Sequence, residues 1–282
     1  MDNITRTGVS SLLQTCMFLR RPYVVLPNTT LNEKFNIQSR ILPPANVYPA
    51  MAYVAIGNGG HKLGLGADSL VAPDVTQHTA RDASTFKPLP WVMRETSNDL
   101  TQPERAKYGL RREEEHGGRR YYVYYLKRLD LTKVDPLLEY IVVDGNTKTV
   151  TEFVPDSSDL NPTPAELSPT GVNTVSGDYL SASAKVPVTL TAEDMVELRN
   201  VAQVLYNDDK YAIISEVALC TGVDKTVDSP APGNTTIPFN EALVVQVAAF
   251  ISAFIPAKYS VSGFNMLLDL GATEPLFKLN AP

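Results

Sequence analysis

The sequence predicts an α+β protein with a β-hairpin-rich N-terminal half, an extended proline-rich middle arm and a helical C-terminal part. Two pairs of turn residues, Gly117-Gly118 and Asp144-Gly145, each separate two runs of β-type residues, which is the pattern of a two-residue hairpin. The segment from Asn240 to Ile255 is apolar on nearly every side. That pattern predicts a helix that is either central in a core or covered by another subunit.

Composition and hydrophobic periodicity divide the chain into three regions. Residues 1–154 carry the short β-type runs. Residues 155–190 hold five prolines without sustained periodicity, a length that predicts an arm docked on something else or a disordered linker. Residues 191–282 begin with a capping box, in which Asp194 follows Thr191 by three positions. We expect this last region to pack with the first as one unit.

The second strand of the first predicted hairpin is unusually rich in tyrosine. Because successive side chains of a strand point to opposite faces, Tyr121 and Tyr125 share one face. Tyr122 and Tyr124 share the other. Both faces of this strand are therefore predicted to be aromatic, and both need a covering layer.

Composition and charge limit the classes of function. The chain has 282 residues, of which 44% are hydrophobic, and this suffices for a substantial core in one large or two smaller domains. Its formal net charge is −6, whereas binding to nucleic acid needs clustered Lys and Arg, so no specific nucleic-acid partner is expected. The histidines and cysteines lack the spacing of a metal site. We expect neither a metal nor another cofactor.

The N-terminal stretch SSLLQTCMFLRR is too short for a membrane anchor. Its arginines follow the apolar part, which is the reverse of a signal peptide. No other window reaches the roughly 20 apolar residues of a membrane span. The sequence therefore predicts a protein made and kept in the cytoplasm, without a membrane partner.

The most motif-like stretch is IGNGGHKLGLG, from Ile56 to Gly66. A phosphate-binding loop of the Walker type needs Ser or Thr after its lysine, but Leu63 follows Lys62. A dinucleotide fingerprint needs a third glycine where His61 and Lys62 stand. We interpret the glycines as a flexible or positive-φ bend in the chain, with a nucleotide or small-molecule binding module as the alternative.

The acidic stretch RREEEHGGRR raises the question of catalysis. Adjacent residues of a hairpin point to opposite faces, so Glu113, Glu114 and Glu115 do not converge on one substrate. Cross-strand pairing of Glu with Arg explains the composition without a ligand. No nucleophile motif such as GxSxG is present. We expect no catalytic residue, and a hydrolase acting on a cell-wall polymer through these carboxylates is the alternative.

The single tryptophan lies in the stretch FKPLPWVMRE. Trp91 follows two prolines, and Arg94 comes three positions later. Trp and Arg are the residue types that most often anchor protein interfaces. The competing interpretation is a buried core Trp91 beside an ordinary surface Arg94.

Three stretches carry a resemblance to known proteins: FKPLPWVMRETSNDLTQPERAKYGLRREEEHGGRRYYVYYLKRLDL, YAIISEVALCTGVDK and GFNMLLDLGATEPLF. Together they resemble virion structural proteins of tailed bacteriophages, of the kind found in tail, baseplate or neck assemblies. This resemblance implies a non-enzymatic subunit that is repeated around a ring or wedge. It also implies a location in the virion, after assembly in the host cytoplasm.

The predicted hairpins, arm and apolar C-terminal segment fit a protein whose apolar surface is completed by its neighbours. The expected partners are copies of itself and other virion proteins. The predicted interface residues are Trp91, Arg94, Tyr121, Tyr122, Tyr124, Tyr125, Phe250 and Phe254.

Overall fold

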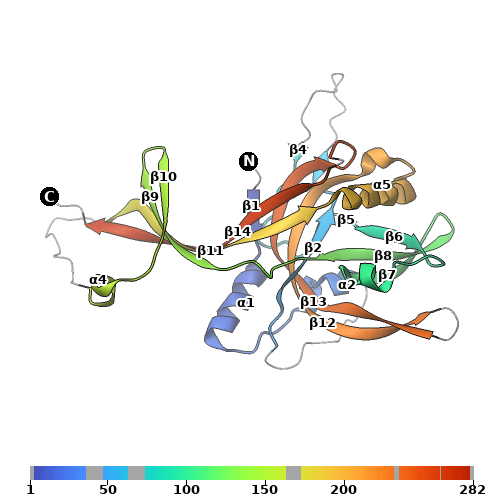
Figure 1. The fold of residues 1–282 in the computed structure, drawn as a ribbon, viewed down its shortest axis with the longest axis horizontal. Coiled ribbons are helices and arrows are strands. Elements are labelled where there is room, and N and C mark those ends of the chain that lie inside the picture. Colours follow the sequence, from blue (N-terminus) through green and yellow to red (C-terminus); the bar gives the residue numbers. More distant parts are fainter. Residues whose placement is uncertain are drawn as a thin grey trace, which may run out of the picture. The chain divides into compact units, whose positions relative to one another are not determined.

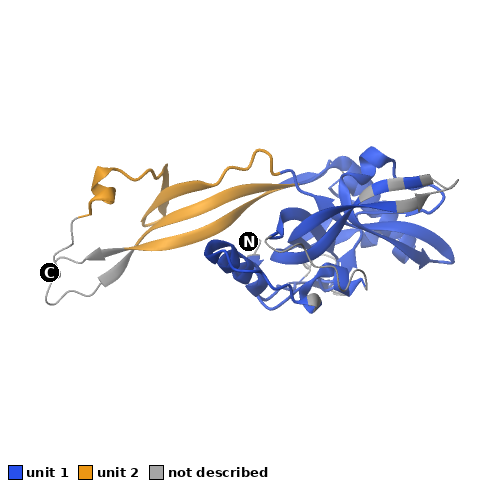
Figure 2. Cartoon of the chain, turned by 90° about the horizontal axis from the view of Figure 1, so that it is seen from below, with its two compact units in different colours: residues 1–130, 189–265 blue, residues 131–188, 266–282 orange. Residues whose placement is uncertain are grey.

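The chain folds into two compact units (Figure 2). Unit 1 takes in residues 1–130 and 189–265, and unit 2 takes in residues 131–188 and 266–282. The boundaries differ from those of the predicted regions, because the C-terminal region contributes to both units. The computed structural model describes residues 3–35, 47–62, 74–162, 173–231, 235–260 and 262–279.

Unit 1 is built on an eight-stranded antiparallel sheet (Figure 1). The main path of the sheet has the order β1-β13-β12-β2-β8-β6, with β5 paired to β2 and β7 paired to β8. A separate two-stranded sheet joins β3 (His61–Lys62) and β4 (Asp74–Val75). The strands of the large sheet are β1 (Asn3–Arg6), β2 (Ala50–Gly57), β5 (Pro88–Leu89), β6 (Val92–Glu95), β7 (Tyr108–His116), β8 (Arg119–Arg128), β12 (Ile213–Ala231) and β13 (Thr235–Pro256).

Helices cap this sheet, and the longest of them follows the predicted capping box. The side chain of Thr191 accepts a hydrogen bond from the Asp194 amide, and Asn207 ends the helix in the left-handed conformation. An ion pair between Lys127 of β8 and Asp194 fixes this helix to the sheet. The helices of unit 1 are α1 (Gly8–Leu19), α2 (Leu31–Lys34), α3 (Gln102–Arg105) and α5 (Ala192–Tyr206), with 3-10 turns at Pro27–Thr29 and Asp209–Tyr211.

The predicted α+β fold with a helical C-terminal part is wrong, because the described chain is mostly β-strand in antiparallel sheets. The segment Asn240–Ile255 lies within strand β13, which pairs with β12 on one side and β1 on the other. Every residue from Glu241 to Ala253 is buried, because both faces of this central strand are covered. A strand buried on both faces has the same all-round apolar pattern as a buried helix. The repeated Val and Ile of this run favour the strand.

The stretch from Asp224 to Pro238 contains proline and glycine residues, a composition typical of a loop. Its described residues continue β12 and β13 as a two-stranded ribbon, with Asp224 opposite Ala242 and Asp228 opposite Pro238. Backbone hydrogen bonds between the two strands keep this stretch extended, although its composition is typical of a loop.

Both predicted hairpins are present. In the first, His116 pairs with Arg119, and the two glycines between them have φ of 58° and 76°. Positive φ at both turn positions is what a type I′ hairpin needs, and glycine adopts it without steric cost. In the second, Asp144 pairs with Thr147, so the turn is Gly145-Asn146, one position later than predicted, and Gly145 has φ of 58°.

Unit 2 is a four-stranded sheet with the order β10-β9-β11-β14. Its strands are β9 (Leu137–Asp144), β10 (Thr147–Glu152), β11 (Asn173–Leu190) and β14 (Phe264–Leu279), and a short helix α4 (Ser157–Leu160) follows β10. The last part of the predicted arm, residues 173–190, is extended and forms strand β11. Residues 163–172 of the arm lie outside the described part of the chain.

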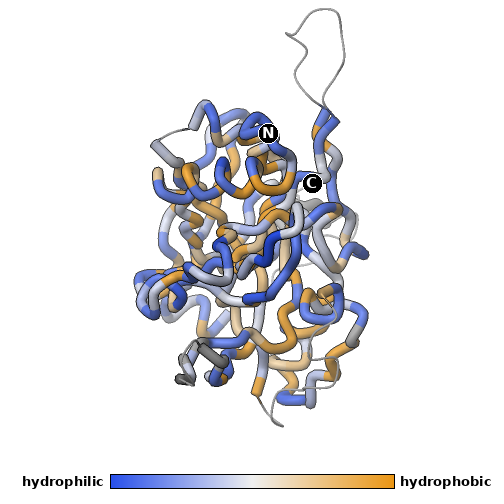
Figure 3. Tube along the Cα trace, turned by 90° about the vertical axis from the view of Figure 1, so that its right-hand side faces the viewer, coloured by the Kyte–Doolittle hydropathy of each residue, from blue (hydrophilic) through white to orange (hydrophobic). Residues whose placement is uncertain are grey.

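The hydrophobic core of unit 1 lies around β2, β8, β12 and β13. In this unit the hydrophobic stretches of chain lie mostly toward the inside of the fold (Figure 3). The largest fully buried side chains include Trp91, Tyr53, Tyr124 and Phe250. Cys220 is also buried, and burial raises the pKa of its thiol to about 12.

Candidate functional site

The glycine-rich stretch that most resembles a motif meets a buried carboxylate. Gly57, the last residue of β2, stands opposite Glu216 of β12 in the sheet register. A Cβ atom at Gly57 would lie 2.5 Å from Glu216 Oε1, and one at Gly59 would lie 2.7 Å from the backbone nitrogen of Lys87. Neither distance is tolerated by a real side chain. Gly57 and Gly59 are therefore needed for close approach and not for positive φ, which corrects that part of our interpretation for these two residues.

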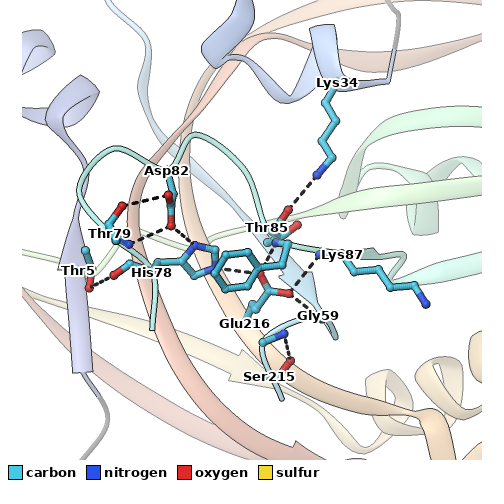
Figure 4. Close-up of polar contacts among 12 residues, drawn as sticks. Thr5, Lys34, Gly59, His78, Thr79, Asp82, Thr85, Lys87, Ser215 and Glu216 are labelled. Carbon is cyan, nitrogen blue, oxygen red and sulfur yellow. Dashed lines mark hydrogen bonds and ion pairs between the residues drawn. The ribbon is translucent and has the colours of Figure 1, made fainter. Parts of the chain in front are cut away.

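The Glu216 carboxylate accepts hydrogen bonds from three backbone amides and contacts the His78 ring (Figure 4). Oε1 accepts from the amide of Gly59 at 2.8 Å and from that of Lys87 at 3.4 Å. Oε2 accepts from the amide of Phe86 at 2.5 Å and contacts His78 Nε2 at 2.8 Å. The side chain is fully buried. Such a carboxylate is tolerated only because these donors replace the water that it loses.

His78 extends this network to a second carboxylate. Its Nδ1 lies 2.9 Å from Oδ2 of Asp82, which also accepts from the Thr79 amide at 2.9 Å. The backbone carbonyl of His78 accepts from the Thr5 hydroxyl at 3.2 Å. The His78 imidazole therefore links the carboxylates of Glu216 and Asp82.

The imidazole of His78 is closed off from solvent. Its side chain has no exposed area, and it is stacked between the rings of Phe86 and Phe250, with centroid distances of 4.1 and 3.8 Å. A substrate cannot reach a ring that is covered on both faces and bonded at both nitrogens. The arrangement therefore has a structural role, because it holds segment 76–87, the glycine stretch and β12 together. We call Glu216, His78 and Asp82 the Glu216 cluster.

The pKa shifts around this cluster follow from burial and hydrogen bonding. Burial lowers the pKa of Lys34, whose Nζ donates to the Thr85 carbonyl at 2.8 Å, although Glu216 acts in the opposite direction. Burial also lowers the pKa of His61. The pKa of Asp82 is lowered. Burial alone would raise it, but hydrogen bonds from Thr79 and His78 outweigh that effect.

The glycine stretch is also tied to α5. The side-chain Nδ2 of Asn58 donates to the Tyr206 hydroxyl at 3.0 Å, and the backbone amide of Asn58 donates to the Lys87 carbonyl at 3.0 Å. Lys87 Nζ lies 4.5 Å from the centre of the Tyr206 ring. The described part of this stretch, up to Lys62, is therefore a packed bend. Residues 63–66, which complete the quoted motif, lie outside the described residues.

Trp91 and Arg94 take different places in unit 1. Trp91 lies in the core, and its Nε1 donates to the Val54 carbonyl at 3.0 Å. Arg94 forms a two-pronged ion pair with Glu197 of α5, with N–O distances of 2.6 and 2.5 Å. Both side chains stabilise contacts between elements of the same chain.

The aromatic interface candidates are also mostly covered within the chain. Tyr121, Tyr124, Tyr125 and Phe250 are buried, and Tyr122 and Phe254 are partly buried. The Tyr124 hydroxyl donates to Asp99 at 2.6 Å, and the Tyr125 hydroxyl donates to Glu114 at 2.7 Å. The Arg111 guanidinium lies 3.5 Å from the centre of the Tyr122 ring. The covering layer that the sequence requires for both faces of β8 is thus supplied largely by unit 1 itself.

The acidic hairpin has the cross-strand pairing that the sequence predicts. Arg120 bonds Glu113 at 3.0 Å across the β7–β8 ladder. Glu114 accepts from Tyr125 and contacts His116, so its carboxylate points away from that of Glu113. Within the described residues, no three His, Cys, Asp or Glu side chains are placed to hold a metal ion. Of the helices in the same ranges, none has the length and apolar character needed to cross a bilayer.

Sequence reasoning did not single out the Glu216 cluster. The available signal was one acidic residue in the otherwise apolar run YAIISEVALC, since a lone charge in a buried strand needs partners. His78 lies 138 positions away in the sequence from Glu216. No local spacing links the two residues.

The chain belongs to a family described as a family of unknown function (DUF7208), whose model matches residues 1–281. No curated protein and no solved structure matches the chain. The match shows that the two units and the segments that join them belong to one family.

The close approach at Gly59 predicts a large effect of one methyl group. Gly59→Ala should lower the free energy of unfolding by about 1–3 kcal/mol, because the new Cβ overlaps Lys87 and Phe86. Gly8→Ala is the matched control, since its nearest neighbour would be 3.6 Å away. Urea titrations followed by the fluorescence of the single tryptophan measure both changes. Equal midpoints for Gly59→Ala and the parent would show that the bend is loose.

The lowered pKa of Asp82 predicts a dependence of stability on pH. A carboxyl whose folded pKa is depressed stabilises the fold fully above its unfolded pKa of about 4, and this contribution is lost as the pH falls through the folded pKa. The difference in unfolding free energy between the parent and Asp82→Asn should therefore be full at pH 6 and shrink below pH about 4. Asp228→Asn, at an exposed position, is the control. A difference that stays constant down to pH 3 would contradict this account.

Proposed function

We propose that this protein is a non-enzymatic structural subunit of a tailed-phage virion, in the tail, baseplate or head–tail neck, which assembles with copies of itself and with other virion proteins. The sequence resemblance suggests the kind of particle. The structural observation that best supports assembly is the exposed apolar surface of α1 and the segment that follows it.

Helix α1 has an unusual distribution of burial for an apolar helix. Of its residues GVSSLLQTCMFL, only Leu13 is buried. Phe18 is 88% exposed, and Val24 in the following segment is 70% exposed. The exposed large apolar side chains of this region, which we call the α1 surface, are Leu12, Met17, Phe18, Leu19, Val24 and Leu26.

The α1 surface is presented on a fixed support. The Thr7 side chain caps the helix by accepting from the Ser10 amide, and its hydroxyl donates to the Val247 carbonyl of β13 at 2.7 Å. The Gly8 amide donates to the Ala80 carbonyl at 2.9 Å. The N-terminal end of the helix is thus held against unit 1 while its apolar side chains face outward.

The energetics favour a neighbour that covers this surface. Burying one Leu, Met or Phe side chain stabilises a complex by about 1.5–3 kcal/mol. A contiguous apolar patch of several such residues marks an interaction surface more often than a free one. The aromatic candidates of the hairpin are mostly engaged inside the chain, so the α1 surface is the better assembly surface on unit 1.

Charge on the α1 surface is expected to disrupt assembly and not folding. The double variant Phe18→Asp/Leu19→Asp should weaken self-association or binding to a virion neighbour tenfold or more, because charged residues would have to be buried. Val196→Asp is the matched control, since Val196 is another exposed apolar residue, on α5. Sedimentation velocity measures association, and urea titration checks the fold. If the Phe18→Asp/Leu19→Asp variant associates like the parent, the α1 surface has no role in assembly.

The place of the protein in the virion is tested separately. Antibody labelling of purified particles of the encoding phage, viewed by electron microscopy, should mark the tail, baseplate or neck. Particles that contain none of this protein by mass spectrometry would contradict the proposed function.

A further inference from the structure

Among the described strands, β10 is an open edge of the unit 2 sheet. It is the end strand in the order β10-β9-β11-β14, and every residue from Thr147 to Glu152 is exposed. An exposed edge strand offers unpaired backbone groups to another strand.

The backbone groups that β10 offers can be identified from its pairing with β9. The Phe153 amide donates to the Leu138 carbonyl at 2.8 Å. In an antiparallel ladder, residues that bond the neighbouring strand alternate with residues whose N–H and C=O point away. Thr147, Thr149 and Thr151 therefore face β9. The N–H and C=O groups of Lys148, Val150 and Glu152 point outward.

The sequence of this edge is complementary to itself. Residues 148–152 read KTVTE, so an antiparallel copy centred on Val150 places Val150 opposite Val150. The same register places Lys148 of each copy opposite Glu152 of the other. Lys148 and Val150 line one face of the sheet, at a groove of about 440 Å³. Glu152 is two positions on from Val150 and shares that face.

A cation from a second copy would also relieve a repulsion inside the chain. Glu152 stands directly opposite Glu139 in the β9–β10 register. Like charges at directly opposed positions of a sheet are destabilising. In the two-fold arrangement, Lys148 of the second copy comes beside Glu152 and offsets this repulsion.

We propose that two copies of this chain pair through β10, in antiparallel register about a two-fold axis at Val150. The paired edges form one continuous sheet from the two unit 2 sheets. Three opposed pairs, Lys148–Glu152, Val150–Val150 and Glu152–Lys148, exchange backbone hydrogen bonds across the axis. The two outer pairs add salt bridges on one face. Isologous contacts of this kind are the commonest way in which soluble chains form dimers.

Charge reversal tests the register on the full chain. Lys148→Glu and Glu152→Lys each place like charges opposite each other twice, so each variant alone should dimerise about tenfold more weakly than the parent in sedimentation velocity. A 1:1 mixture of the two variants restores both opposite-charge pairs and should recover dimerisation. The double variant Lys148→Glu/Glu152→Lys should recover it as well.

A backbone variant tests the edge independently of charge. Val150→Pro removes an outward N–H and leaves the β9 ladder intact, so it should abolish the dimer without lowering the urea midpoint. If Val150→Pro fails to fold, the charge-reversal mixture still decides. A parent that stays monomeric, or a mixture that associates no better than its two components, would overturn the pairing.

The β10 pairing and the proposed function can each be wrong while the other is right. Parent assemblies that are unaffected by every β10 variant would overturn the β10 pairing and leave assembly through α1 standing. A β10-dependent dimer of a protein that is missing from purified virions would support the pairing and contradict the proposed function.

Discussion

The buried carboxylate of Glu216 is the interaction on which the arrangement of unit 1 depends. A carboxylate removed from water costs several kcal/mol unless hydrogen bonds replace its hydration. Here those bonds come from the Gly59, Phe86 and Lys87 amides and from His78. These donors lie in two segments that are both far from Glu216 in sequence, so one side chain of β12 fixes both of them. The contact also lies where β2 pairs with β12, because Gly57 of β2 stands directly opposite Glu216.

This constraint separates an interior that is fixed from surfaces that are left open. The glycine stretch packs around the carboxylate, and most of the aromatic residues of β8 serve the core. Large apolar side chains of α1 and of the segment that follows it are exposed, and so are apolar residues of other elements, such as Val196 of α5. The free main-chain groups of β10 lie in unit 2. A subunit of a larger assembly needs such a division, since its core has to hold its shape while its surfaces bind neighbours.

Local features of the fold could be predicted from the sequence, and long-range ones could not. Gly117-Gly118 and the Thr191–Asp194 capping box act within a few residues, and both are present as predicted. Asn240–Ile255 was misassigned because a strand covered on both faces and a buried helix share one apolar pattern. The contact between His78 and Glu216 joins distant positions, which no spacing reveals. The self-complementary order of residues 148–152 is readable, but it has meaning only once β10 is known to be an edge.

The free energy of unfolding of Glu216→Gln tests this account most directly. The amide keeps the size of the side chain but removes the charge and turns an NH₂ group toward backbone donors. We expect a loss of about 3–5 kcal/mol relative to the parent in urea. Glu95→Gln, which removes an exposed ion pair with Arg119, should lose far less stability than Glu216→Gln. A Glu216→Gln variant as stable as the parent would show that the carboxylate does not hold unit 1 together.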